Sequence, residues 1–133
     1  MWGPAPRRRA VDRRRPTRGD STDLVAVDAR GRVVGWACLG PSRDTATAPD
    51  TGELYALYVQ PSLTGSGIGR ALLEAVHAHA HAAGFAPVLL WVLAGNGGAR
   101  RFYERAGYVA DGAVQADDYD GVSVPEVRYR RAL

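Results

Sequence analysis

Three glycines, Gly65, Gly67 and Gly69, stand between the end of an apolar strand-like run and the start of a helical pattern. Inside a regular element each glycine costs about 0.5–1 kcal/mol relative to alanine, so three at one junction require a reason other than stability. Backbone amides without side chains can approach a ligand closely, and the amides and positive dipole end of a helix N-terminus favour an anion. The junction therefore predicts a phosphate site, for which a diphosphate is the natural ligand.

Two nucleotide-binding motifs are excluded by the same stretch of sequence. A Walker A loop requires a lysine, and all 17 basic residues of this chain are arginine. A dinucleotide fingerprint that starts at Gly65 requires a third glycine where this chain has Arg70. A tight structural turn without a ligand is the alternative interpretation of the glycines.

The segment 64–69 resembles motif A of the GNAT superfamily of N-acetyltransferases, Q/R-x-x-G-x-G/A. The preceding GELYALYVQP (52–61) resembles the fourth strand of that family with its splayed end, and AGNGGARRFYERAGY (94–108) resembles the motif that follows. The resemblance runs from about residue 24 to the C-terminus. It implies a GNAT-like mixed α/β fold, an acetyl-CoA-dependent N-acetyltransferase activity, and acetyl-CoA as the co-substrate.

The resemblance also implies which residues hold the coenzyme. In the family the motif A amides bind the CoA pyrophosphate, the preceding strand pairs with the pantetheine arm through its backbone, and an asparagine in the next motif hydrogen-bonds that arm. The implied coenzyme-binding residues are Leu57, Tyr58, Val59, Thr64, Gly65, Ser66, Gly67, Ile68, Gly69, Arg70, Asn96 and Tyr103. Thr64 stands where the family usually has arginine or glutamine, so one long side-chain contact to phosphate is expected to be missing.

Acetyl transfer from a thioester to an amine needs a neutral nucleophile and a proton for the leaving thiolate. An α-amine has a pKa of about 7.7–8.0 and a lysine side chain about 10.4, so the acceptor must lose a proton in the site or arrive neutral. The leaving thiol has a pKa of about 8.5, and a tyrosine can protonate its thiolate. Tyr103 matches the tyrosine that the family uses as this acid, although an aromatic at helical spacing also fits a core position. Glu53 is the candidate base, directly or through a water, with a solvated strand-end charge as the alternative. Trp91 stands where some family members place a glutamate, so it cannot serve as the base. The oxyanion of the reaction is expected to accept a hydrogen bond from a backbone N–H near Val59.

Three alternating histidines, His77, His79 and His81, raise the question of a metal site, because residues 77 and 81 share a helix face. No third ligand of the H-E-x-x-H kind accompanies them, so no metal is expected and a solvated helix face is the favoured interpretation. Cys38 is the single cysteine, which excludes an intramolecular disulfide, and its apolar strand predicts a packing role.

Asp117, Asp118 and Asp120 belong to a segment rich in aspartate and glycine, for which a loop is expected between the last two strands. In the family this loop borders the acceptor site, so its carboxylates could attract a cationic amine. A hydrated turn without that role is the favoured alternative.

The elements that must position these residues follow from hydrophobic periodicity. Strands are predicted at 24–27, 32–39, 53–59, 87–93, 108–114 and 124–129, and helices at 68–83 and around 99–106. The predicted buried face of the first helix consists of Ile68, Leu72, Val76, Ala80 and Ala83. Gly84 is expected to end that helix. The order of elements predicts one mixed α/β domain over residues 21–133.

Residues 1–20 differ from the rest in charge. They carry seven arginines and two aspartates, a net +5, whereas the remainder carries ten arginines and twelve acids, a net −2. A disordered leader is expected here, and nucleic-acid binding is disfavoured because the segment has no periodic pattern. No apolar run approaches the roughly 18 residues of a membrane span, which together with the single cysteine favours the cytoplasm.

The acceptor remains open from the sequence, as a small-molecule or peptide amine. Because the first strand and the two helices with which the family's domain begins are not recognisable before residue 24, an N-terminally shortened domain is expected. That expectation keeps an alternative function open, in which the chain is a CoA-binding module or a degenerate paralogue without catalysis. A homodimer is left open as well.

Overall fold

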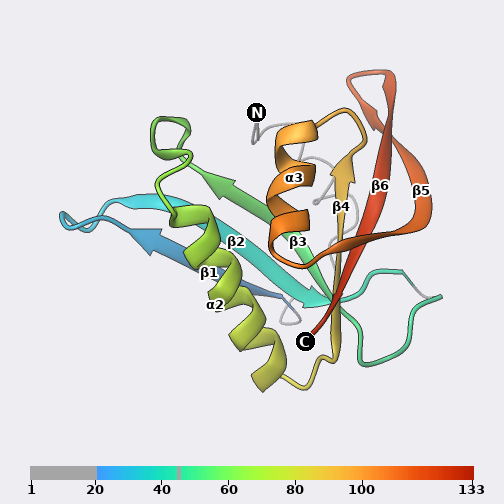
Figure 1. The fold of residues 1–133 in the computed structure, drawn as a ribbon, viewed down its shortest axis with the longest axis horizontal. Helices are drawn as coiled ribbons and strands as arrows, with labels where there is room; N and C mark the ends of the chain where they lie inside the picture. Colours follow the sequence, from blue (N-terminus) through green and yellow to red (C-terminus); the bar gives the residue numbers. More distant parts are fainter. Residues whose placement is uncertain (1–20, 45) are drawn as a thin grey trace.

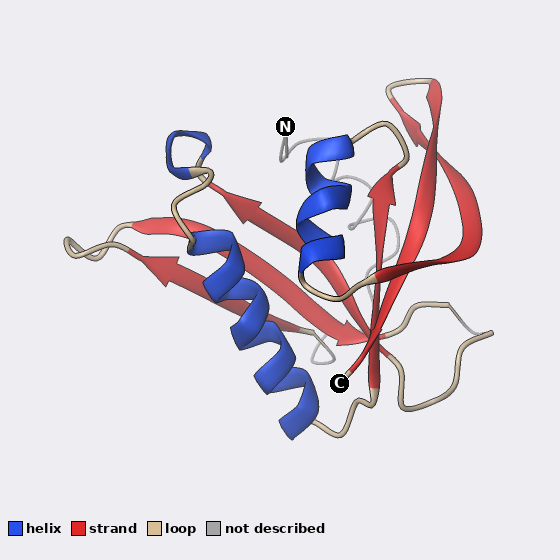
Figure 2. Cartoon of the chain, viewed as in Figure 1, coloured by secondary structure: helices blue, strands red, loops and turns tan. Residues whose placement is uncertain are grey.

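The computed structural model describes residues 21–44 and 46–133, so the expected leader lies outside the described residues. The elements in chain order are β1 (Thr22–Val27), β2 (Val33–Pro41), β3 (Gly52–Val59), the 3-10 helix η1 (Pro61–Leu63), α2 (Ile68–Ala82), β4 (Pro87–Leu93), α3 (Gly97–Arg105), β5 (Val109–Tyr119) and β6 (Val122–Ala132). Both α-helices lie against the same face of one six-stranded sheet (Figures 1 and 2). The predicted mixed α/β fold and the order of its elements are confirmed, with η1 as an addition.

The sheet opens at its centre. Its strand order is β1-β2-β3-β4-β6-β5, and all neighbours are antiparallel except β3 and β4, which α2 connects as a crossover. These two strands pair at residues 52–54 and 88–90 and then diverge (Figure 1). Their carboxyl-terminal halves therefore enclose a wedge, and the glycine-rich turn follows one of its two sides.

The two helices bury their apolar faces against this sheet. The main core contains Leu72, Leu73, Val76, Ala80, Ala99 and Tyr103 from the helices and Ala37, Leu39, Leu54, Leu57, Val59, Val88, Leu90, Val92 and Tyr129 from the strands. Gly84 has a φ of 92°, and the Phe85 amide donates back to the Ala80 carbonyl at 3.0 Å, so the predicted glycine stop is confirmed. None of the helices in residues 21–44 and 46–133 combines the length and the apolar surface that a membrane span requires.

The last hairpin is longer than the sequence predicts, which corrects the expected loop of aspartates. β5 and β6 meet at a two-residue turn, so Asp117 and Asp118 are strand residues and Asp120 lies in the turn. Asp120 and Gly121 have φ of 56° and 82°, as in a type I′ turn. An Asp-Gly turn of this type aligns the flanking strands, and their cross-strand pairs outweigh the low strand propensity of aspartate.

Candidate active site

A groove of about 240 Å³ lies where α2 begins, beside the end of β3. Its lining residues are Val59, Thr64, Gly65, Gly67, Gly69, Arg70, Gly98, Phe102 and Arg105. The first six of these are among the predicted coenzyme-binding positions, and they come from the end of β3, the turn and the first turn of α2. The structure therefore brings the glycine-rich segment and the end of β3 together around one groove.

The backbone amides of the turn are the main donors at this groove. Within residues 21–44 and 46–133, no backbone carbonyl accepts a hydrogen bond from the amides of Gly65, Gly67 or residues 68–70. The Ser66 amide, by contrast, donates to the Leu63 carbonyl at 3.1 Å. The first amides of any helix lack partners inside the helix, and at this helix they border a cavity. An anion at this position gains about 0.3–1 kcal/mol from the helix dipole in addition to its hydrogen bonds.

The backbone conformation favours glycine at positions 65 and 67, whereas at position 69 a Cβ would lie in contact with its neighbours. Gly65 and Gly67 have φ of 87° and 93°, a backbone conformation that other residues rarely adopt, although a Cβ at either would meet no atom within 4 Å. Gly69 lies in the first turn of α2, where a Cβ would come within 3.4 Å of the Phe102 ring and 3.5 Å of Val59. A larger side chain at position 69 would therefore occupy the space between α2 and α3.

One wall of the groove comes from α3 and was missed by motif matching. Gly98, Phe102 and Arg105 are four and three residues apart, so they share one face of the helix. This spacing is visible in the sequence and is the signal that could have identified them. Arg105 and Arg70 bring two guanidinium groups to a groove in which Thr64 supplies no long basic side chain.

Four other predicted coenzyme-binding residues have side chains that do not line the groove. Leu57 is a core residue and Tyr58 is half-buried on β3, so the contacts predicted for them are contacts of the backbone. Ile68 packs against the main core, and the Ser66 hydroxyl donates to the Leu63 carbonyl. The coenzyme contacts of these four residues stay predictions.

Asn96 and Tyr103 both hold structural positions. Asn96 caps α3, since its side-chain oxygen accepts a hydrogen bond from the Ala99 amide at 3.1 Å. Tyr103 is 7% exposed, and its ring centre lies 5.1 Å from that of Phe102 and 5.8 Å from that of Tyr108. The contacts agree with the core position that helical spacing predicts, while the roles in coenzyme binding and as an acid stay predictions.

Glu53 is buried in an ion pair, which corrects the alternative of a solvated strand-end charge. Its side chain is 1% exposed, and its Oε2 lies 2.6 Å from Nη2 of Arg43. Its Oε1 accepts a hydrogen bond from the Arg43 backbone amide at 2.9 Å. The guanidinium of Arg43 also lies 4.3 Å from the ring centre of Tyr55. The pair holds the loop after β2 against β3, and the role of Glu53 as a base stays a prediction.

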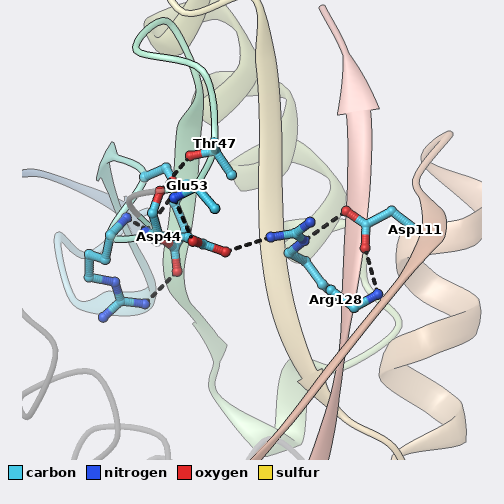
Figure 3. Close-up of polar contacts among 9 residues, drawn as sticks. Asp44, Thr47, Glu53, Asp111 and Arg128 are labelled. Atoms are coloured by element: carbon cyan, nitrogen blue, oxygen red, sulfur yellow. Dashed lines mark hydrogen bonds and ion pairs between the residues drawn. The ribbon is translucent and has the colours of Figure 1, made fainter.

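A second group of ion pairs ties the same loop to the other half of the sheet. Arg128 on β6 contacts Asp44 in the loop and Asp111 on β5, each at 2.7 Å (Figure 3). The Thr47 hydroxyl donates to the Asp44 carbonyl at 2.7 Å. The guanidinium of Arg128 lies 5.7 Å from the ring centre of Trp91, the residue at which some family members carry a glutamate. A cation that is paired with two carboxylates therefore lies beside the Trp91 ring.

The expectation that all three histidines lie on a solvated helix face is wrong for His77, which is half-buried. Its Nε2 lies 2.7 Å from the Tyr108 hydroxyl, and its Nδ1 lies 2.9 Å from Nη1 of Arg131. Because arginine can only donate, Nδ1 accepts, and Nε2 carries the proton and donates to Tyr108. His79 and His81 are exposed, as predicted. His77 therefore connects α2 to the start of β5 and the end of β6.

The setting of His77 predicts a loss of stability in mild acid. Burial, followed by the charge of Arg131, lowers the pKa of His77 from 6.5 to about 4. Below pH 6.5 the unfolded chain protonates this histidine and the folded chain does not, so the free energy of unfolding should decrease as the pH falls from 6.5 towards 4. Urea unfolding across this range should show a slope that His77→Gln reduces and that His79→Gln leaves in place. Identical slopes for the wild type and the His77 variant would contradict the buried neutral histidine.

Known proteins are similar to this chain in both sequence and fold. The sequence profile of the acetyltransferase (GNAT) family matches residues 2–108, so the match begins earlier than residue 24, where the motif resemblance starts. A mycothiol acetyltransferase from Saccharopolyspora erythraea is 37% identical over 84 residues, covering 62% of this chain and 25% of that protein. The Mycobacterium tuberculosis protein named "Probable N-acetyltransferase Rv2775" is 34% identical over 106 residues, covering 78% of this chain and 57% of its own. The chain thus spans between a quarter and about half the length of these relatives.

Solved structures give the same result. A GNAT-family protein from Desulfovibrio desulfuricans superposes with a TM-score of 0.70 at 31% identity, covering 85% of this chain and 69% of that chain. A ribosomal-protein-alanine N-acetyltransferase from Brucella melitensis superposes with a TM-score of 0.75 at 24% identity, covering 100% and 83%, and so shares the fold. With its glycine-rich turn beside an open sheet, the chain belongs to the GNAT family of acetyltransferases.

Proposed function

We propose that this chain transfers an acetyl group from acetyl-CoA to a primary amine, by direct attack of the amine within a ternary complex. The observation that carries the proposal is the groove at the start of α2, where the amides of residues 65 and 67–70 meet Arg70 and Arg105. A diphosphate matches these donors in charge, and each hydrogen bond to a charged group contributes about 1.5–3 kcal/mol. Membership of the GNAT family supports acetyl-CoA as the diphosphate ligand.

The wedge between β3 and β4 supports a position for the pantetheine arm. Among the described strands, β4 pairs with β3 at residues 52–54 alone, so the following residues of β3 face the opening. An extended chain that carries amides can pair with such an edge in the manner of an added strand. The pantetheine arm is such a chain, and we propose that it lies along the backbone of Leu57, Tyr58 and Val59, with Asn96 as a side-chain partner.

The proposed reaction requires two proton transfers, one to the departing sulfur and one from the attacking amine. The amine nitrogen attacks the thioester carbon, the C–N bond forms and the C–S bond breaks, which leaves an amide and the CoA thiol. Tyr103 is the proposed donor of the proton to the departing sulfur, and Glu53 is the proposed acceptor of the amine proton, directly or through a water. The backbone N–H near Val59 is the proposed partner of the oxyanion.

The acceptor is proposed to be a small-molecule amine, with a peptide amine as the second choice. The support is the set of relatives named mycothiol acetyltransferase, of which the Kocuria rhizophila protein is 39% identical over 89 residues. A panel of small amines and peptide amino termini, scored by release of the CoA thiol, would identify the acceptor. Release with no member of the panel above the rate of hydrolysis would favour a CoA-binding module without catalysis.

Replacing Gly69 by valine should weaken acetyl-CoA binding at least about tenfold, a change of roughly 1.4 kcal/mol. The added methyl groups would enter the groove between Val59 and Phe102, where a Cβ at position 69 already makes contact. Calorimetry and the rise in Tm with acetyl-CoA measure the effect. Ala71→Val is the matched control, because Ala71 is exposed on the same helix and should leave binding unchanged. No rise in Tm for the wild type would remove the proposed function, and equal affinity for the valine variant would place the coenzyme elsewhere.

A further inference from the structure

The face of the sheet opposite α2 and α3 carries a buried carboxylate beside the end of β4. Glu126 on β6 stands opposite Leu93, the last residue of β4, and opposite Gln115 on β5. Val92 and Val127 lie next to these positions along β4 and β6 and pack against the main core that the helices cover. Because neighbouring residues of a strand point to opposite faces, Leu93 and Glu126 point away from the helices. Beyond Glu126 the last hairpin continues past β4 (Figure 1), so the carboxylate lies at the open end of the wedge.

Two neutral donors hold the carboxylate of Glu126. Its Oε1 accepts a hydrogen bond from Nε2 of Gln115 at 2.6 Å, and its Oε2 accepts one from the Tyr119 hydroxyl at 2.9 Å. The residue is 6% exposed, and within residues 21–44 and 46–133 no arginine or histidine forms an ion pair with it. Each carboxylate oxygen can accept a second hydrogen bond. The negative charge is therefore buried, oriented and not compensated by a cation of the described chain.

The missing cation distinguishes Glu126 from Glu53, the other buried carboxylate among the described residues. Both oxygens of Glu53 are bound by Arg43, whereas a buried charge without such a partner carries a large desolvation penalty. The hydrogen bonds of Glu126 do not require this charge. A glutamine could meet the same two partners, because the amide of Gln115 can turn and a tyrosine hydroxyl both donates and accepts. A carboxylate in this setting is typical of a functional site, and a cationic group of a ligand would supply the compensating charge.

The strand order separates Glu126 from the reacting atoms. In the proposed function the thioester lies between β3 and β4, near Val59, and the acceptor nitrogen attacks it there. Glu126 belongs to β6, on the other side of β4, and neighbouring strands lie about 4.8 Å apart. The carboxylate therefore stands beside the reacting nitrogen, at a distance of about one strand spacing or more. A group of the acceptor other than the reacting nitrogen is its expected partner.

We propose that Glu126 binds a second positively charged group of the acceptor, so that short diamines are preferred over amines with a single charge. This inference rests on the proposed function, which supplies the reacting amine and acetyl-CoA. An alkyl amine such as the lysine side chain has a pKa of about 10.4, so the group that does not react stays protonated at neutral pH. An ammonium carries three donors, which suit the remaining acceptor positions of the carboxylate.

The test compares 1,4-diaminobutane with 4-amino-1-butanol, which has the same chain length and one ammonium fewer. Thiol release at saturating acetyl-CoA should give the wild type a kcat/KM about ten to a hundred times higher for the diamine, because one charged hydrogen-bonded pair is lost with the alcohol. Glu126→Gln should remove this preference through a lower kcat/KM for the diamine, and Glu126→Asp, which keeps the charge, should retain part of it. Asp50→Asn is the control of matched charge, since Asp50 is exposed in the loop before β3, and it should preserve the preference.

The outcomes separate this inference from the proposed function. Equal kcat/KM of the wild type for the two amines, or a preference that Glu126→Gln keeps, would overturn this inference and leave acetyl transfer intact. An equal loss with both amines in Glu126→Gln would assign the carboxylate to the reacting nitrogen and would overturn it as well. Transfer to no amine of a wider panel would overturn the proposed function and this inference with it. Should Glu126→Gln fail to fold, the comparison in the wild type and the behaviour of Glu126→Asp decide the result.

Discussion

Tyr103→Phe is expected to lower the rate of acetyl transfer about 100-fold or more while changing the affinity for acetyl-CoA much less. A positioned general acid contributes about 10²–10⁴-fold to rate, and the variant removes the hydroxyl that would protonate the departing sulfur. The ring itself is 7% exposed and packs against Phe102 and Tyr108, so phenylalanine should keep the same place in the core. Thiol release at saturating acetyl-CoA and amine measures the rate, and calorimetry measures the affinity.

Tyr55→Phe is the matched control for this experiment. Tyr55 is a second buried tyrosine, 7% exposed, whose hydroxyl donates to the Pro41 carbonyl. Its loss should cost about 1 kcal/mol of stability and no activity. A rate for Tyr103→Phe within about threefold of the wild type would show that the ring serves packing alone, and the proposed acid would have to be sought elsewhere.

Glu53→Gln is expected to lower the free energy of unfolding by about 3–5 kcal/mol, the usual cost of removing one partner from a buried ion pair. The carboxylate is 1% exposed, and it receives both the guanidinium and the backbone amide of Arg43. Glutamine would present its NH₂ group to a guanidinium that is 10% exposed, and the Arg43 charge would stay buried without compensation. Urea unfolding followed by circular dichroism measures the change.

The control for Glu53 is Glu74→Gln, which removes a carboxylate 73% exposed and 3.7 Å from Arg70. An exposed pair of this kind is worth at most about 0.5 kcal/mol. A loss below about 1 kcal/mol for Glu53→Gln would show that the buried pair contributes little to stability. The same variant, assayed well below its Tm, also tests the proposed base, because a folded variant with the wild-type rate would exclude Glu53 from that role.

Much of the framework of this protein follows from local sequence. The strand 87–93 is bounded as its apolar run predicts, α2 begins at Ile68 as expected, and Gly84 ends the helix. The glycine-rich turn was identified in the same way, because helix starts, helix stops and tight turns depend on residues within a few positions of one another. The resemblance to a family added what local rules cannot supply, namely the ligand that we propose for the turn.

The tertiary structure decided which distant residues meet. Arg105, Arg131 and His77 come from three separate elements, and no spacing along the chain brings them to the cavity that they line between α2 and α3. Glu53 could be taken for a strand-end charge because its partner Arg43 is placed against it only when the loop after β2 folds back. The sequence by itself therefore determined the elements and the glycine-rich turn, since these follow from short-range backbone preferences. The charged cavity, the buried ion pair and the neutral histidine depend on packing between elements, which only the folded chain specifies.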